Sequence, residues 1–275
     1  MFYNKNRFAL ISVLLLQFFP ICMLAQPEKW DVYTASYEKG VGSVIINLSA
    51  KNYAPVNSLP YLVITGVKFK GCTVDGFPDK DAFIQLYAIS DSIKAAIGGS
   101  VKNNMVGTFT YQCSRKDYYY VSDTTGLRIL LDNVFRKYFK VYEAIINIKE
   151  DRKWEIYRTG LYPNEITLEF MANDKVLSKL TEAGDKLEKE RKVDHWIYFS
   201  SENDRDCFIN YVIQKNFKIE NKDKVSNGMR PYKLQISRVD KVDIGSISRN
   251  TLNLRKEAAK CHGEYDGWET FVIKE

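Results

Sequence analysis

Histidine occurs at only two positions in this 275-residue chain, and these are the first candidates for acid–base chemistry. The imidazole pKa near 6.5 makes His195, which stands between Asp194 and Trp196, a candidate proton acceptor at neutral pH. A histidine that only forms hydrogen bonds at a strand edge is the commoner situation, and we favour it here. His262 follows a predicted helix, where the helix dipole stabilises a positive charge. Neither histidine therefore predicts a catalytic site.

The other reactive side chains do not form a recognisable catalytic constellation. Cys261 and His262 are adjacent, so on a helix their side chains diverge by about 100° and do not form a dyad. Four carboxylates lie near the ends of predicted elements, where acids are ordinary: Asp123, Asp132, Asp151 and Glu155. The sequence contains no nucleophile elbow, phosphate-binding glycine loop, HExxH or CxxC pair. It therefore predicts no catalytic residue, no metal and no cofactor.

The cysteines predict disulfides. Five are present, and the four that follow Cys22 are Cys72, Cys113, Cys207 and Cys261. Cys207 lies early in one predicted helix and Cys261 in the last turn of another, and antiparallel packing brings those two ends together. We predict a disulfide between Cys207 and Cys261, with two buried free thiols as the alternative. Cys72 and Cys113 form a second pair that is less well determined, because the sequence leaves the strand order around them open.

Residues 1–25 have the pattern of an export signal. Lys5 and Arg7 precede an apolar run at 8–21, and a cleavage point follows Ala25. The run is shorter than the roughly 20 residues that a membrane span needs. A retained anchor and a lipoprotein attached through Cys22 are the alternatives. We therefore expect a protein of the periplasm or cell envelope, or a secreted one, without stable membrane insertion after cleavage.

Composition is that of a globular protein, with 45% hydrophobic and 27% charged residues. The formal charge is +6, and removal of Lys5 and Arg7 leaves a charge too small to indicate a nucleic-acid partner. About 250 residues after the signal suit two domains. We expect them at residues 26–170 and 171–275.

The first domain is predicted to be α+β. Its expected elements are strands at 42–49 and 61–69, helices at 79–97 and 127–138, a long tyrosine-rich strand at 108–122, and one or two strands at 141–157. Alternation places two rings of the run Tyr118-Tyr119-Tyr120 on one sheet face and one on the other. We expect a core on one face and tyrosines exposed to solvent on the other, with stacking on bases or sugars as the alternative.

The second domain is predicted to consist of a leading helix followed by strand, helix, strand, strand, helix and strand. That order is the split βαβ, or ferredoxin-like, arrangement, which places both later helices on one face of a four-stranded sheet. Asn173 is the expected cap of the leading helix, and 185–192 is an expected solvated charged segment. We expect turns at Asn227-Gly228 and Asp266-Gly267, and a closing strand at 268–273.

Two segments of the second domain carry a resemblance to a known family. One comprises Gly184-Asp185, Arg191 and the stretch 193–199, and the other is the run 263–269, which contains Tyr-Asp-Gly-Trp. Together they resemble the regulator of ribonuclease activity B family, the inhibitors of ribonuclease E, over about the last 100 residues. The resemblance implies a protein that binds a protein partner, and it supplies no catalytic residues.

The first domain resembles domain of unknown function 695. The residues that carry this resemblance are Asp151, Trp154, Tyr157, Leu161, Tyr162 and Pro163. The second domain departs from the bacterial ribonuclease inhibitors because it is not strongly acidic, and an acidic surface would suit docking on a basic partner. Ribonuclease E is also cytoplasmic, whereas this chain carries an export pattern. The resemblance therefore predicts the fold better than it predicts the partner.

We expect a non-enzymatic binding or regulatory protein of the cell envelope, with a protein partner of unknown identity. The residues expected to form its binding surface are Asp194, His195, Trp196, Tyr265, Asp266, Trp268, Trp154 and Tyr157. The main alternative is a periplasmic hydrolase with its site between the domains, which convergent acids or a histidine in an interdomain cleft would favour. A polyanion binder that uses Lys and Arg on the sheet face is a third hypothesis.

Overall fold

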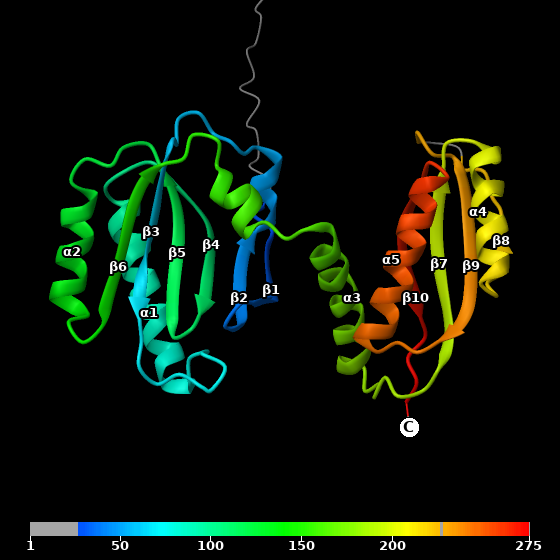
Figure 1. Ribbon diagram of the computed structural model, residues 1–275, viewed down its shortest axis with the longest axis horizontal. Coiled ribbons are helices and arrows are strands. Elements are labelled where there is room, and N and C mark those ends of the chain that lie inside the picture. Colours follow the sequence, from blue (N-terminus) through cyan, green and yellow to red (C-terminus); the bar gives the residue numbers. More distant parts are fainter. Residues whose placement is uncertain (1–26, 226–227, 275) are drawn as a thin grey trace, which may run out of the picture.

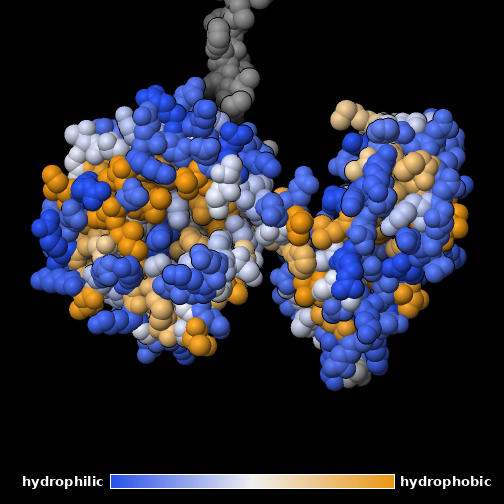
Figure 2. Space-filling view, viewed as in Figure 1, coloured by the Kyte–Doolittle hydropathy of each residue, from blue (hydrophilic) through white to orange (hydrophobic). Residues whose placement is uncertain are grey.

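The computed structural model describes residues 27–225 and 228–274 as two α+β domains, each built on one antiparallel sheet (Figure 1). The predicted export signal and Asn227 of a predicted turn lie outside the described residues. In the described part of the chain, every helix is too short or too polar to cross a membrane. Figure 2 shows hydrophobic side chains on the surface of the first domain and along the side of the second domain that faces it.

Six strands form the sheet of the first domain. They are β1 (Trp30–Tyr37), β2 (Gly40–Asn47), β3 (Tyr61–Lys68), β4 (Asn103–Tyr111), β5 (Ser114–Val121) and β6 (Glu143–Glu150). Its helical elements are η1 (Leu48–Asn52), α1 (Lys80–Gly98), α2 (Leu127–Tyr138) and η2 (Ile156–Leu161). The strands lie in the order β1-β2-β4-β5-β3-β6, which leaves β1 and β6 at the two edges.

Helix α1 forms where the apolar spacing predicts it. Leu86, Ile89, Ile93 and Ile97 recur at helical spacing and are at most 2% exposed. The Asp79 carboxylate caps the helix by accepting a hydrogen bond from the Ala82 amide at 2.9 Å. Together with α2, this helix covers one face of the six-stranded sheet.

The single long strand predicted at 108–122 is wrong, because this stretch is a hairpin of β4 and β5. Gln112 and Cys113 form its two-residue turn with φ values of 49° and 54°. Sequence rules assign such turns mainly to Gly, Asn and Asp, so the turn has no signal of its own. Tertiary contacts hold it instead: Gln112 Nε2 donates to the Lys39 carbonyl at 2.6 Å, and Cys113 is disulfide-bonded to Cys72.

Both faces of the first sheet are covered near the tyrosine run. Tyr119 packs into the core under α1 and α2, while Tyr118 and Tyr120 pack into a second core on the opposite face. The expected solvent-exposed tyrosine face is therefore wrong, since η2 and the segment after β2 cover it. The prediction of strand structure up to residue 157 is also wrong, because β6 ends at Glu150 and a helical segment follows.

Four strands form the sheet of the second domain. Its elements are α3 (Glu165–Glu182), β7 (Arg191–Phe199), α4 (Glu202–Gln214), β8 (Lys218–Asn221), β9 (Tyr232–Asp240), α5 (Ile244–Lys260) and β10 (Gly263–Thr270). The strand order β10-β7-β9-β8, with antiparallel pairs throughout, is the split βαβ order and confirms the predicted fold. Helix α3 runs through residue 170, so the division of the chain at that point stays a prediction.

The prediction that Asn173 caps a helix is wrong. Asn164 caps α3, and Asn173 lies inside the helix with its side chain 1% exposed. Its Oδ1 accepts from Trp268 Nε1 at 2.8 Å, and its Nδ2 donates to Ser248 Oγ and Thr251 Oγ1, each at 3.0 Å. A satisfied buried amide thus joins α3 to α5 and β10.

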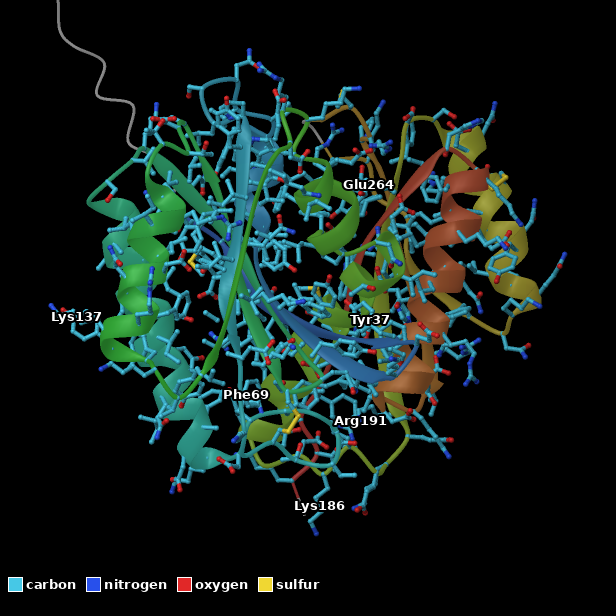
Figure 3. The ribbon with its side chains drawn as sticks, turned by 60° about the vertical axis from the view of Figure 1, so that its left-hand side comes forward. Tyr37, Phe69, Lys137, Lys186, Arg191 and Glu264 are labelled. Atoms are coloured by element: carbon cyan, nitrogen blue, oxygen red, sulfur yellow. A yellow bond between two sulfur atoms is a disulfide. The ribbon has the colours of Figure 1, made fainter. Side chains whose placement is uncertain are left out.

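The charged segment at 185–192 is not wholly solvated, because Asp185 and Arg191 are buried within it. Lys186 of the same segment is exposed and points away from the domain (Figure 3). Arg191 also donates to the Phe271 carbonyl at 3.3 Å, and Asp185 accepts from the Ile273 amide at 2.8 Å. These contacts attach the end of the chain to the loop before β7. They also explain why β10 ends at Thr270, short of the strand predicted to reach residue 273.

Candidate functional site

The structure separates the residues expected to form one binding surface. Five of them are buried in the cores: Trp154 and His195 at 0%, Tyr157 at 0%, Tyr265 at 2% and Trp268 at 9% exposure. Buried rings do not line an accessible surface, so this part of the expected site is wrong. Asp194, Trp196 and Asp266 remain accessible to solvent.

His195 belongs to the core of the second domain. Its Nδ1 lies 2.9 Å from the Tyr265 hydroxyl, and its ring meets the edge of Phe217. Burial, with the nearby positive charge of Arg238, lowers the pKa of His195 to about 3. The imidazole is therefore neutral at physiological pH and enclosed by packing, which removes it as an acid–base group at the surface.

Trp154 and Tyr157 fasten the segment around η2 onto the first sheet. The Trp154 ring stacks on Tyr120 with centroids 4.0 Å apart, and its Nε1 donates to the Leu59 carbonyl at 3.0 Å. The Tyr157 hydroxyl donates to the Asn47 carbonyl at 2.7 Å. Both aromatic residues therefore have a structural role in covering the second core.

The accessible residues of the second domain lie on what we call the open face, the side of its sheet opposite α4 and α5. Alternation along β7 points His195 and Ile197 toward these helices, and Asp194, Trp196 and Tyr198 away from them. In register, Ser237 stands opposite Asp194, Gln235 opposite Trp196, and both Lys233 and Glu264 opposite Tyr198. The open face therefore includes Lys192, Asp194, Trp196, Tyr198, Lys218, Glu220, Lys233, Gln235, Ser237, Val239, Glu264 and Glu269.

A polar network crosses one end of the open face. Gln235 Nε2 donates to Asp194 Oδ1 at 3.0 Å, and the Lys192 ammonium bridges Asp194 and Glu220 at 3.0 and 3.2 Å. The Ser237 hydroxyl donates to Glu220 at 2.7 Å. Hydrogen bonds from Ser237, and then from two lysines, lower the pKa of Glu220 to about 2 and keep it ionised.

The positive charges of Lys192 and Lys218 on this face are paired with carboxylates, unlike those of a polyanion-binding surface. Lys192 is matched by Asp194 and Glu220, Lys218 also pairs with Glu220 at 3.1 Å, and Arg230 pairs with Glu264. A polyanion site needs a field of one sign, which neighbouring opposite charges cancel. The geometry therefore does not favour the hypothesis of a polyanion site on the sheet.

Trp196 and Tyr198 form the aromatic centre of the open face, and both are half-buried. Beside Trp196, β10 has a bulge between Tyr265 and Gly267, so Asp266 and Gly267 lie within a strand rather than in the expected turn. Gly267 has a φ of 157°, and a Cβ built on it would meet no atom within 4 Å. The missing side chain leaves open space on the sheet at the position that pairs with Trp196.

Other candidate chemistry is not assembled by the fold. Asp151 is engaged as a helix cap, accepting from the Glu155 and Ile156 amides at 2.8 and 3.1 Å and from the Tyr120 hydroxyl at 2.7 Å. Among the described residues, a groove between the domains is lined by Asp174 as its one carboxylate and by neither histidine nor cysteine. Within residues 27–225 and 228–274, acids, histidines and cysteines form no cluster suited to a metal ion.

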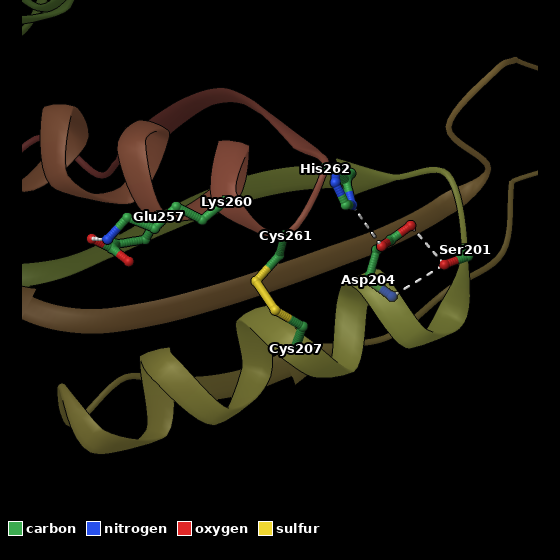
Figure 4. Close-up of a disulfide and its surroundings, with 7 residues drawn as sticks. All are labelled: Ser201, Asp204, Cys207, Glu257, Lys260, Cys261 and His262. Carbon is green, nitrogen blue, oxygen red and sulfur yellow. Dashed lines mark hydrogen bonds and ion pairs between the residues drawn. A yellow bond between two sulfur atoms is a disulfide. The ribbon is translucent and has the colours of Figure 1, made fainter.

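The two cysteine pairs expected from the sequence lie within bonding distance. Cys207 and Cys261 are joined by a disulfide (Figure 4), with their Cα atoms 5.9 Å apart. Cys72 and Cys113 are joined with their Cα atoms 5.7 Å apart. His262 contacts the α4 carboxylate of Asp204 at 3.2 Å, close to the first of these bonds. Cys261 is thus a structural residue with no free thiol.

Sequence reasoning missed Tyr198, Gln235 and Glu220. The first could have been found, because it follows Trp196 by two positions in the same strand and so shares its face. The other two required the strand order, since β9 pairs with β7, and β8 with β9, only after the chain has passed through α4. Pairing in the folded sheet, rather than local pattern, places them in the site.

The fold and this face define a two-domain α+β protein whose second domain carries a flat aromatic and polar surface. Residues 170–270 match the family described as Regulator of ribonuclease activity B. Residues 28–162 match a family of unknown function, DUF695. The resemblance predicted for each half of the chain is therefore confirmed.

Among solved structures, a crystal structure of an unknown protein from Galdieria sulphuraria is similar to 78% of this chain and 99% of that chain. The sequence identity is 9% and the TM-score is 0.21. No curated protein matches the chain.

Proposed function

We propose that this protein is a non-enzymatic binding or regulatory module of the cell envelope that holds a protein partner on the open face of its second domain. The observation that carries the proposal is the position of Trp196 and Tyr198 at the centre of that face, inside a rim of paired charges. Protein interfaces concentrate binding energy in central Trp, Tyr and Arg residues, surrounded by polar contacts that exclude water. The match of the second domain to a regulator family supports the same role.

The cell-envelope location is supported by the N-terminal pattern of Lys5, Arg7 and the apolar run at 8–21. The two disulfide pairs agree with it, because such bonds persist in oxidising compartments. We keep the location and the partner together in one proposal, since the compartment restricts which proteins the open face meets.

The test is affinity capture from envelope fractions with the full-length protein as bait. The variant carries Trp196→Ala and Tyr198→Ala on the open face. The matched control carries Tyr138→Ala on α2, where the ring is 61% exposed and away from this face. The proposal is supported if the wild type and the Tyr138→Ala control capture a protein that the double variant does not capture. Cross-linking of that protein to β7 or β9 would place it on the face.

Equal capture by the double variant and by the wild-type protein would show that the open face is not the binding site. Turnover of a substrate by the purified protein would contradict the non-enzymatic role. Thermal unfolding of both variants by circular dichroism verifies that neither result comes from loss of the fold.

A further inference from the structure

One wall of the groove between the two domains is a continuous stretch of strand. Consecutive residues 32–36 of β1 line it on one side, and helix α3 lines it on the other, with a volume of about 670 Å³. An ion pair between Asp31 and Lys175 joins the strand to the helix beside the groove. Figure 2 shows hydrophobic side chains where this side of the second domain faces the first.

Strand β1 is an edge strand with an unpaired side. It pairs with β2 along its whole length, and in the described residues no strand lies beyond it. In an antiparallel edge strand, every second residue directs its N–H and C=O groups outward, where another strand can bond to them. The Val32 N–H already donates to Asp31 Oδ1 at 2.9 Å. Because residues 32–36 line the groove, an occupant of the groove would meet the remaining outward groups of this stretch.

The walls of the groove expose apolar side chains that an occupant would bury. Val32 on the strand is 56% exposed, and Ile166 and Phe170 on α3 are 57% and 39% exposed. Ile244, at the start of α5, is 38% exposed in the same groove. Apolar groups beside an open strand edge suit an extended peptide with apolar side chains at alternate positions.

Acidic side chains lie next to the apolar part of the groove. A second hollow of about 690 Å³ shares Asp174 and Ile244 with the groove and continues it. Its lining adds Glu182, Glu188 and Asp243, against Lys186 as the one basic residue among the described lining. An occupant that extends into this hollow therefore gains from positive charge.

We propose that the groove is a strand-addition site for an extended peptide of a partner protein, with alternating apolar residues beside β1 and basic residues next to them. Five consecutive residues of the strand, 32–36, line the groove, so a peptide that pairs with this stretch is the natural unit. This site is separate from the open face, and its occupant need not be the protein that the open face holds.

Synthetic peptides on the full-length protein test the proposal by fluorescence anisotropy. The first peptide alternates valine and threonine over the length of β1 and continues with lysines. A second replaces the lysines with glutamates, and a third carries N-methyl groups at alternate backbone positions. We expect the first peptide to bind, and the other two to bind about 10-fold more weakly or not at all.

Matched variants locate the binding. Ile166→Glu places a charge in the groove, while Ile213→Glu makes the same change on α4 at a nearly equal exposure of 56%. We expect Ile166→Glu to weaken the lysine peptide about 10-fold and Ile213→Glu to leave it unchanged. Asp174→Lys should weaken the lysine peptide and not the glutamate peptide.

Hydrogen exchange identifies the backbone that takes part. Bound peptide should slow exchange of β1 amides and leave β6, the opposite edge of the same sheet, unchanged. Equal binding of the N-methylated peptide, equal effects of the two Ile→Glu variants, or protection at β6 would each overturn the proposal. So would absence of binding up to about 1 mM, or a stable dimer that pairs β1 with a second copy of the chain.

Discussion

Asp185 and Arg191 form a bidentate ion pair, and their side chains are 2% and 0% exposed to solvent. The pair closes the loop between α3 and β7 and, through Phe271 and Ile273, holds the end of the chain against it. Both residues belong to the segment that resembles the regulator family. Their role in this protein is to attach chain segments, which accounts for the residue types without any contact to a partner.

Replacement of Asp185 by Asn should lower the free energy of unfolding by about 3–5 kcal/mol at neutral pH, because Arg191 would remain buried without its counter-charge. Urea unfolding measures the change. The control is Glu143→Gln, which breaks the exposed pair with Lys68 and should cost about 1 kcal/mol or less. Equal losses for the two variants would contradict a special role for the buried pair.

The contribution of Asp185 should also depend on pH. Its hydrogen bonds from Arg191 hold the pKa of this carboxyl well below its usual range. A depressed pKa stabilises the folded state fully above the unfolded value near 3.9, and the stabilisation is lost as pH falls below it toward the folded pKa. The stability difference between wild type and Asp185→Asn should therefore be constant above about pH 5 and shrink below about pH 4.

His195 should destabilise the protein in mild acid. Its pKa is about 3 in the folded state, whereas an unfolded histidine titrates near 6.5. The unfolded state thus binds the proton first, so stability is full above pH 6.5 and falls by about 1.4 kcal/mol per pH unit below it. His195→Gln should remove this slope in urea unfolding from pH 6.5 to 4. An unchanged slope in the variant would mean that the pKa of His195 is similar in the folded and unfolded states.

The bond between Cys207 and Cys261 should be a large part of the stability of the second domain. The two residues are 54 positions apart, and closing a loop of that length stabilises by about 4 kcal/mol in the loop-entropy estimate. The Cys207→Ser and Cys261→Ser double variant should lose about that amount. Non-reducing peptide mapping of protein from its native host gives a direct check, and two free thiols at these positions would refute the pairing.

Mass spectrometry of the protein from its native host should find a mature N-terminus near Gln26. The reason is the signal pattern at 1–25, with Ala25 before the expected cleavage point. Cytoplasmic protein that retains Met1 would rule out export. A mature protein that begins at an acylated Cys22 would instead support the lipoprotein alternative.

Ribonuclease E should be inhibited weakly or not at all by this protein. Lysines and acids of the open face neutralise one another, so the face lacks the acidic field that suits docking on a basic partner. A cleavage assay with an authentic inhibitor as the positive control measures the effect. Inhibition at the concentrations that the authentic inhibitor requires would show that the regulatory activity does not depend on an acidic surface.

Local pattern in the sequence predicted several elements and one long-range bond, for which free thiols were the alternative. Leu86, Ile89 and Ile93 repeat at the period of a helix, and that helix is α1. The order of elements after residue 190 defines the ferredoxin-like sheet, and its antiparallel helices bring Cys207 to Cys261. Such inferences succeed because helical period, strand alternation and chain order are properties of neighbouring residues or of connectivity.

Tertiary structure alone decided which polar residues are buried and which surfaces are free. Asp185 is buried because its carboxylate pairs with Arg191 and accepts a hydrogen bond from the Ile273 amide. Ile273 lies 88 positions after Asp185 in the chain. Glu220 joins the open face only because β8 lies beside β9, and β1 meets α3 only where the two domains come together. Burial and site geometry depend on contacts between distant segments, and no local sequence pattern records which segments will meet.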